Sequence, residues 1–423
     1  MAVVGGIIGG GIFRTPATVA ERLRSPGLVL LAWVIGGVVA LIGAFCFGEL
    51  GQRRPRAGGG YVYLRETFGP LPAFLYGWTL VLVIATGAIA AVAVTFADYS
   101  LALFDQPHRF SVPLAIAAIV LLSGINYVGV RPAAITQNIF TILKLTALAV
   151  LIGAGMFLAA PTVPYRPLPS PSVVSTAGAI GAALVPILFT YGGWQQTNFI
   201  AEEIVEPERN LPRALVLGVT IVVAVYLLAN VAYLRVLGVA GLAASTAPAA
   251  DTMQALLGPV GGKIIAAGIA ISTFGFLNLV ILVTPRVLQA MAADRVFFER
   301  LALLHPVYRT PTAAIVALAG FAILLTLSGT FGQLVDYVTF GDWIFFGLCV
   351  AALFVYRRRE QRAGSTEQNA YRVPGYPITP AIFVLAAALA VYSSITSNPR
   401  NAAIGAGLIG LGVPAFLYWR SRL

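Results

Sequence analysis

Apolar runs of about 20 residues recur along the whole chain, and they constrain its fold more than any other feature. Each run is long enough to cross the hydrocarbon core of a bilayer, about 30 Å thick, as an α-helix. Inside that core only helices and closed barrels satisfy their own backbone polar groups. The runs therefore predict an all-α membrane protein.

The charge balance supports this interpretation. Of the 423 residues, 59% are hydrophobic and 10% are charged, whereas soluble domains carry about 25% charged residues. The net charge of +11 could suggest nucleic acid, but the cations lie in short loops between apolar runs. That distribution is typical of topology signals. We expect no soluble domain, no cleavable signal peptide and no nucleic-acid partner.

We predict about 12 membrane spans. They cover residues 2–22, 27–50, 71–100, 111–128, 133–159, 175–204, 212–237, 260–290, 312–329, 335–356, 378–396 and 401–419. With a cytoplasmic N-terminus, the inner loops and C-terminus hold 18 of the 27 Lys and Arg residues, and the outer loops hold seven. This bias predicts that both termini are cytoplasmic.

Glycine-rich breaks interrupt two of these spans, at residues 9–11 and 190–194. Two interrupted spans at matching places in two halves indicate a transporter's binding site. We therefore divide the chain into an inverted repeat, residues 1–160 and 175–356, followed by two spans in residues 378–420.

Each break would expose both backbone N–H donors and backbone carbonyl acceptors. At the first break, the outer half-helix starting near Ile12 presents free N–H groups, which suit a carboxylate. The inner half-helix ending near Ile7 presents free carbonyls, which suit an ammonium group. The same geometry is expected from Phe189 to Trp194. An α-amino acid carries both charges side by side. The alternative is that the glycines only allow close helix packing, but the matching positions of the two breaks favour binding.

Lys144 lies deep inside the predicted fifth span. It is about eleven residues from the start of that span, roughly 16 Å along the helix, so snorkelling to the interface fits poorly. A buried ammonium group needs carbonyls or a carboxylate as partners. We interpret Lys144 as an internal cation or a proton carrier.

Charged residues near the cytoplasmic ends of spans allow two interpretations. Glu202 and Glu203 either end an interfacial helix or form a gate by pairing with Arg53, Arg54 or Arg56.

Two further charged residues lie near span ends or breaks. We interpret Glu49 as solvated at the end of its span rather than coupled to protons. Arg14, one turn past the first break, either reaches an outer vestibule or snorkels.

Aromatic residues cluster around the second break. Phe189 and Trp194 flank it and serve either as a lid or as packing, and Tyr191 and Trp343 lie at or near the proposed site.

The residues that usually bind metals do not cluster. Cys46 and Cys349 fall inside spans and are interpreted as small buried side chains, while His108 and His305 fall in loops. We expect no metal, no cofactor and no disulfide-linked heavy-chain partner.

Several motifs together resemble the amino acid–polyamine–organocation superfamily. Residues 5–16 and 48–50 are similar to the opening of its members. Residues 189–204, residues 207–212 and residues 371–377 resemble its L-type amino acid transporter branch and that branch's bacterial relatives. The resemblance covers nearly the whole chain, and the sixth-span motif is its most specific part.

The resemblance implies a five-plus-five inverted repeat with two extra helices. It implies that the substrate carboxylate meets backbone N–H groups of Gly10 and Gly11. The amino group would meet carbonyls of Ile7, Phe189 and Gly192, with Phe189 also serving as an aromatic gate. The candidate substrate-binding residues are Ile7, Gly9, Gly10, Gly11, Phe189, Tyr191, Gly192, Gly193 and Trp194.

The resemblance also assigns Lys144 a role. It matches a fifth-span lysine that stands in for a sodium ion in sodium-independent members, with Ser272 or Thr273 as neighbours. This chain departs from many relatives in having Gly10 between the flanking glycines and Gln195 after Trp194.

We therefore predict a permease, not an enzyme, in the inner membrane. It would carry a neutral α-amino acid by alternating access, through sodium-independent exchange or proton-coupled uptake. The substrate is predicted to be neutral because no fixed charge is evident in the side-chain pocket apart from Arg14, and no acidic partner is well placed. The alternatives are a cationic amino acid or polyamine transporter of the same fold, an ion channel, or a non-transporting sensor. A channel would require rings of like residues or a repeated filter sequence, and the chain has neither.

Overall fold

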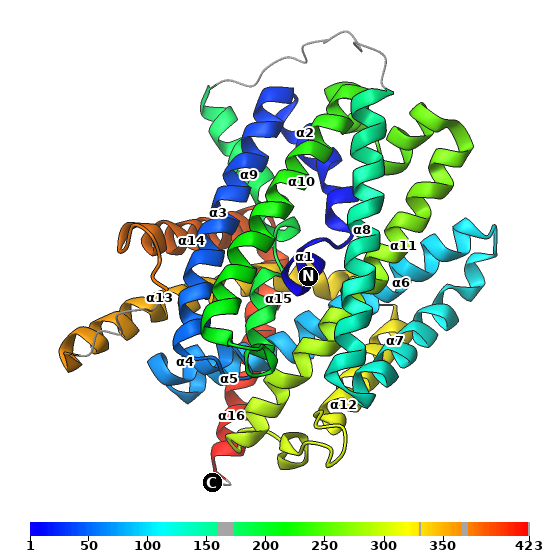
Figure 1. The fold of residues 1–423 in the computed structure, drawn as a ribbon. Helices are drawn as coiled ribbons and strands as arrows, with labels where there is room; N and C mark the ends of the chain where they lie inside the picture. Colours follow the sequence, from blue (N-terminus) through cyan, green and yellow to red (C-terminus); the bar gives the residue numbers. More distant parts are fainter. Residues whose placement is uncertain (159–172, 330, 365–370, 422–423) are drawn as a thin grey trace.

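The computed structural model describes residues 1–158, 173–329, 331–364 and 371–421. Within these ranges every regular element is a helix, so the predicted all-α fold is confirmed. Figure 1 shows the helices gathered in one bundle.

Eight described helical segments are long and apolar enough to cross a membrane. They are Pro26–Arg53 (α3), Pro70–Leu103 (α5, η2 and α6), His108–Val128 (η3 and α7), Val130–Phe157 (α8), Pro207–Ala244 (α10), Pro248–Ala293 (α11), Ile378–Ser397 (α14) and Pro399–Arg420 (α15 and α16).

The other four predicted spans coincide with interrupted, short or partly described helices. They are α1 (Ala2–Ile7) with η1 (Gly11–Phe13) and α2 (Thr15–Leu23), α9 (Val173–Thr190) with η4 (Trp194–Glu203), α12 (Thr312–Ser328) and α13 (Phe331–Ala363).

Proline fixes where several of the long helices begin. Pro26, Pro70, Pro207 and Pro248 each lie in the first turn of their helix, where the missing N–H leaves no acceptor unpaired. Two of these helices, α10 and α11, begin earlier than the sequence predicts. Each is kinked at a glycine in the left-handed region, Gly238 in α10 and Gly258 in α11.

The broken first helix lies in the middle of the bundle. In Figure 1 the N-terminus is drawn near the centre, beside α10 and α8. α1 packs against α10, η4, α8 and α11, and α10 in turn packs along α3. The first break is therefore surrounded by other helices, as an unwound segment at membrane depth requires.

A short helix missed by the sequence prediction, α4 (Gly60–Phe68), packs beneath the bundle against α13 and α11. Its residues Tyr61 to Leu64 are all buried. In Figure 1 it lies near α5, toward the end of the molecule where the C-terminus is drawn. Its sequence was too short to be distinguished from a loop, and its burial depends on neighbours that are distant in sequence.

Candidate functional site

The first break is a real interruption of the helix. α1 ends at Ile7, and Ile8 has an extended backbone with φ −75° and ψ 90°. A short 3-10 turn, Gly11–Phe13, follows before α2 starts at Thr15. The predicted break is confirmed, but the outer half does not run as one α-helix from Ile12, as expected.

Two backbone donors at this break are free. Neither the Gly10 nor the Gly11 N–H donates to an acceptor among the residues the structure describes. Both glycines line a cavity of about 340 Å³. Free backbone N–H groups that open onto a cavity form a concave site for an anion.

The second break lies directly against the first. α9 ends at Thr190, a turn follows, and the 3-10 segment η4 starts at Trp194. Gly193 has φ +104°, and a Cβ placed on it would lie 2.2 Å from the carbonyl oxygen of Gly6. Only glycine permits both the backbone angle and this close approach of the two breaks.

Tyr226 on α10 bridges the two breaks, and the sequence prediction missed it. Its hydroxyl lies 3.0 Å from the carbonyl oxygen of Ile7 and 3.4 Å from that of Thr190. The Thr15 and Thr190 hydroxyls, 2.8 Å apart, add a second bridge. A tyrosine inside an apolar span is the signal that could have identified this residue.

The carbonyls expected to bind an amino group are partly used. Ile7 accepts from Tyr226, and the Phe189 carbonyl accepts from the Gly192 N–H at 3.0 Å. A carbonyl oxygen has two lone pairs, so each of these retains capacity for a further donor. The Gly192 carbonyl accepts no hydrogen bond from the described residues.

Most of the predicted binding residues line one cavity. The 340 Å³ cavity is bounded by both breaks, α6, α11 and α13. The predicted residues on its wall are Ile7, Gly9, Gly10, Gly11, Phe189, Gly192, Gly193 and Trp343. Phe189 is 49% exposed.

Two predicted binding residues lie outside this wall. Tyr191 is buried, and its hydroxyl donates to the Trp33 carbonyl at 3.3 Å. The Trp194 ring packs against Phe47, with ring centroids 4.9 Å apart, and against Phe383. Both side chains pack against helices behind the second break, so their expected place at the substrate is not what the structure shows.

Lys144 reaches the first break. Its side chain is fully buried, and its Nζ donates to the carbonyls of Ile8 at 2.7 Å and Gly5 at 3.1 Å. Ser272 Oγ lies 3.2 Å from the same Ile8 carbonyl, whereas Thr273 donates within its own helix to Ile269. Lys144 and Ser272 therefore meet at the first break, and Thr273 does not join them.

One acidic side chain was missed. Asp342 on α13 lines the cavity, so the expectation that no acidic partner is well placed was wrong. An ionisable residue inside a predicted span was the available signal. Arg14 lines the same cavity, which agrees with the vestibule interpretation rather than with snorkelling.

The expected gate pairs are not formed. Glu203 pairs with Arg286 at 3.0 Å, and the Arg286 side chain is only 1% exposed within α11. Glu202 is exposed and has no ion pair in the part of the chain that the structure describes. The interpretation in which either residue pairs with Arg53, Arg54 or Arg56 is therefore not supported, because Arg53 and Arg54 pair with other carboxylates and no ion pair in the described ranges joins Arg56 to Glu202 or Glu203.

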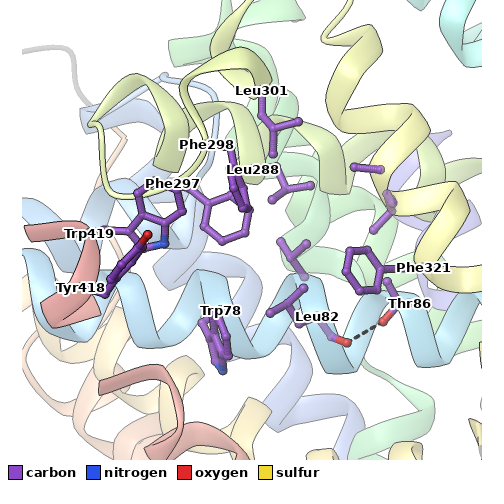
Figure 2. A pocket seen from close by; sticks show the side chains of 13 residues that line it. Trp78, Leu82, Thr86, Leu288, Phe297, Phe298, Leu301, Phe321, Tyr418 and Trp419 are labelled. Atoms are coloured by element: carbon purple, nitrogen blue, oxygen red, sulfur yellow. Dashed lines mark hydrogen bonds between the residues drawn. The ribbon is translucent and has the colours of Figure 1, made fainter. Parts of the chain in front are cut away.

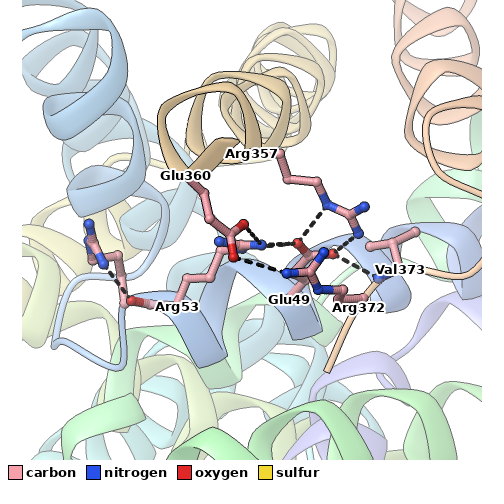
Figure 3. Close-up of polar contacts among 7 residues, drawn as sticks. Glu49, Arg53, Arg357, Glu360, Arg372 and Val373 are labelled. Carbon is pink, nitrogen blue, oxygen red and sulfur yellow. Dashed lines mark hydrogen bonds and ion pairs between the residues drawn. The ribbon is translucent and has the colours of Figure 1, made fainter. Parts of the chain in front are cut away.

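Arg53 belongs to an ionic cluster between α3 and α13, which Figure 3 shows. Arg53 pairs with Glu49 at 2.7 Å and with Glu360 at 3.0 Å. Glu49 is fully buried and also accepts from Arg357 at 2.6 Å and from the Val373 N–H at 2.7 Å. The interpretation of Glu49 as solvated was wrong, because α13 and the segment before α14 fold over it.

A second group of ion pairs anchors α4. Arg54 pairs with Glu66 at 2.5 Å, and Arg65 pairs with Asp294. The Tyr61 hydroxyl also donates to Asp294, at 2.7 Å. Burial raises the pKa of Tyr61, and the Asp294 carboxylate raises it further, so the hydroxyl remains a donor at neutral pH.

A second cavity, of about 460 Å³, is unsuited to a charged ligand (Figure 2). None of its 13 lining residues is charged, and most are aromatic or aliphatic. The hydroxyl of Thr86 on its wall already donates to the Leu82 carbonyl at 2.8 Å. Its wall therefore offers no charged group to a zwitterion.

The comparison with known proteins identifies a family of transporters. A sequence model described as amino acid permease matches residues 1–417. The chain is 33% identical to the large neutral amino acids transporter small subunit 2 of Rattus norvegicus, with 99% of this chain and 80% of the relative aligned. It is 32% identical to two Mus musculus proteins, the b(0,+)-type amino acid transporter 1 (94% of this chain, 81% of the relative) and the Asc-type amino acid transporter 1 (99% and 80%).

One of these names bears on partners. The Rattus norvegicus relative is named as a small subunit, whereas for this chain we expected no disulfide-linked heavy-chain partner. Cys46 and Cys349 are both buried and free.

Proposed function

Because the chain belongs to the amino acid permease family, we propose that it carries an α-amino acid across the cytoplasmic membrane by alternating access. The observation that carries this proposal is the contact between two broken helices whose backbone groups open onto one cavity. Such breaks, near the middle of the membrane, are where transporters of this architecture hold their substrates.

The zwitterion would lie across the first break. Its carboxylate would accept from the free N–H groups of Gly10 and Gly11, and its ammonium group would donate to the carbonyls of Ile7, Phe189 and Gly192. A charged partner strengthens each of these hydrogen bonds relative to a neutral one. A polyamine has no carboxylate to satisfy the Gly10 and Gly11 donors, which disfavours that alternative.

The side-chain end of the cavity favours a neutral group along most of its wall. Ile84 on η2, Ala88 and Val92 on α6, and Phe276 on α11 supply an apolar surface. Burial of an aliphatic or aromatic side chain there would contribute about 25 cal/mol per Å² of apolar area removed from water.

Lys144 supports sodium-independent transport. Its Nζ occupies the carbonyls of Gly5 and Ile8, and an ammonium group held there repels a second cation. Exchange of amino acids, or uptake coupled to a proton carried by Lys144, are the two modes compatible with this arrangement.

Alternating access would follow from the repeat. Residues 1–160 and 175–356 would form two inverted units that rock around the breaks, with residues 378–420 outside them. The bias of positive charge supports a cytoplasmic position for both termini, and we assign the protein to the inner membrane.

Reconstitution into liposomes tests the proposal. Vesicles loaded with unlabelled amino acids should take up a radiolabelled neutral amino acid at a saturable rate, equally in sodium and choline buffers. The recovered label should be chemically unchanged, since no catalysis is proposed.

Three outcomes would contradict the proposal. Unsaturable ion currents would indicate a channel, and binding without flux would indicate a sensor. Uptake equal to that of protein-free vesicles would remove the transport function altogether.

A further inference from the structure

Asp342 differs from Glu49 and Glu203, which both have ionic partners. Glu49 accepts from two arginines, and Glu203 pairs with Arg286. Asp342 has no hydrogen bond or ion pair with any residue in the described ranges, although it lies inside α13. Its free carboxylate lines the same cavity as both breaks.

An unpaired carboxylate within a membrane span is costly, and such residues are retained where they meet a polar ligand or pathway. A ligand cation entering the cavity would remove this cost. It would also form a charge-assisted hydrogen bond, which is stronger than a neutral one.

The surroundings of Asp342 suit a cation on an alkyl stem. Trp343 and Phe346 follow it along α13, and Phe189 lines the cavity from the second break. Aromatic faces attract a cation, and the apolar wall of α6 fits the methylene groups that carry it. Lysine-like and arginine-like side chains combine these two features.

Arg14 is the competing partner within the cavity. It also lines the wall, but no ion pair joins it to Asp342, and it lies beyond the first break at the start of α2. If Arg14 dominated the pocket, acidic side chains would be preferred instead.

We propose that Asp342 selects α-amino acids whose side chain ends in an amine or guanidinium group, in addition to neutral ones. This inference rests on the proposed function, since it assumes that an α-amino acid occupies the cavity. It makes Asp342 a specificity-determining residue at the side-chain end of the site.

The test compares arginine with citrulline in reconstituted vesicles. The two molecules have nearly the same shape, but citrulline ends in a neutral urea group. The wild-type protein should show a kcat/KM for arginine about ten- to hundredfold above that for citrulline. Asp342→Asn should reduce this ratio to about one.

Asp105→Asn is the matched control. It removes the same charge from an exposed outer loop, where Asp105 pairs with Lys263, and it should leave the arginine to citrulline ratio unchanged. If Asp342→Asn fails to fold, the ratio of arginine to citrulline kcat/KM in the wild-type protein still tests the inference.

Several results would overturn the inference. A wild-type ratio near one would do so, as would a preference for glutamate over glutamine, or an equal loss of all substrates in Asp342→Asn. In each of these cases leucine exchange by the wild-type protein would still support the proposed function. Failure of the wild-type protein to exchange any amino acid would refute both.

Discussion

The two lysines of this chain lie in opposite environments. Lys144 is buried and attached to two carbonyls of the first break, while Lys263 is exposed and pairs with Asp105. These are the only lysines in the sequence, so one serves as a natural control for the other.

Lys144→Ala should reduce amino acid exchange by at least about tenfold. The change removes the Lys144 donor from the Gly5 carbonyl and leaves the Ile8 carbonyl with the Ser272 hydroxyl alone, and a buried unsatisfied group costs about 1–3 kcal/mol. Initial rates in proteoliposomes measure the effect, and size-exclusion profiles show whether the protein is folded. Lys263→Ala should transport normally. Unchanged exchange by Lys144→Ala would refute the role assigned to this residue.

Gly193→Ala should destabilise the protein. The left-handed backbone angle alone costs about 1–2 kcal/mol for alanine, and the added Cβ would overlap the Gly6 carbonyl. A lower melting temperature in detergent is the expected result. Gly10→Ala is the matched control, because Gly10 has φ −80° and no atom within 4 Å of an added Cβ. Equal melting temperatures for the two variants would contradict the close contact.

At the scale of elements, ion pairs fix how helices close around the site. Arg286 on α11 holds Glu203 at the end of η4, and the cluster of Figure 3 joins α3 to α13. These pairs lie along helix ends, away from the cavity, so they should affect stability and closure rather than substrate contacts.

Glu203→Gln should lower the free energy of unfolding by about 2 kcal/mol. The Arg286 side chain is 1% exposed, and removal of its partner leaves a buried charge uncompensated. The Glu203 side chain is 26% exposed, so water offsets part of the loss. Thermal unfolding in detergent measures the difference. Glu202→Gln, at the exposed neighbouring position, should melt like the wild type, and a similar loss there would argue against the pair.

The sequence predicts elements better than it predicts partners. The two breaks and Lys144 were identified because glycines and a charge stand out within apolar runs. The sequence did not identify the ionic partners of Glu203 and Arg53, because ion pairing depends on which helices become neighbours in the fold. Asp342 was visible within its span, but a single charged position does not show which face of the helix meets the cavity.

For the whole molecule, the distribution of positive charge predicts the orientation in the membrane. Gln106 lies exposed in a predicted outer loop, and Arg300 lies exposed in a predicted inner loop. The two native cysteines are buried and should give little background labelling.

In intact cells, Gln106→Cys should react with a membrane-impermeant maleimide, and Arg300→Cys should react only after the cells are opened. Labelling detected by gel shift gives the result, and the unmodified protein is the control. The reverse pattern would mean that both termini face outward.

The attachment of Lys144 to the chain has an energetic consequence. A dissolved metal ion at that place would travel with the substrate and bring its own electrochemical gradient into the cycle. The lysine is part of the chain and is not transported, so no metal-ion gradient drives substrate movement through this position. Net movement would then follow only the ratio of solutes on the two sides, together with any proton that the lysine releases, and it would reverse when that ratio is inverted.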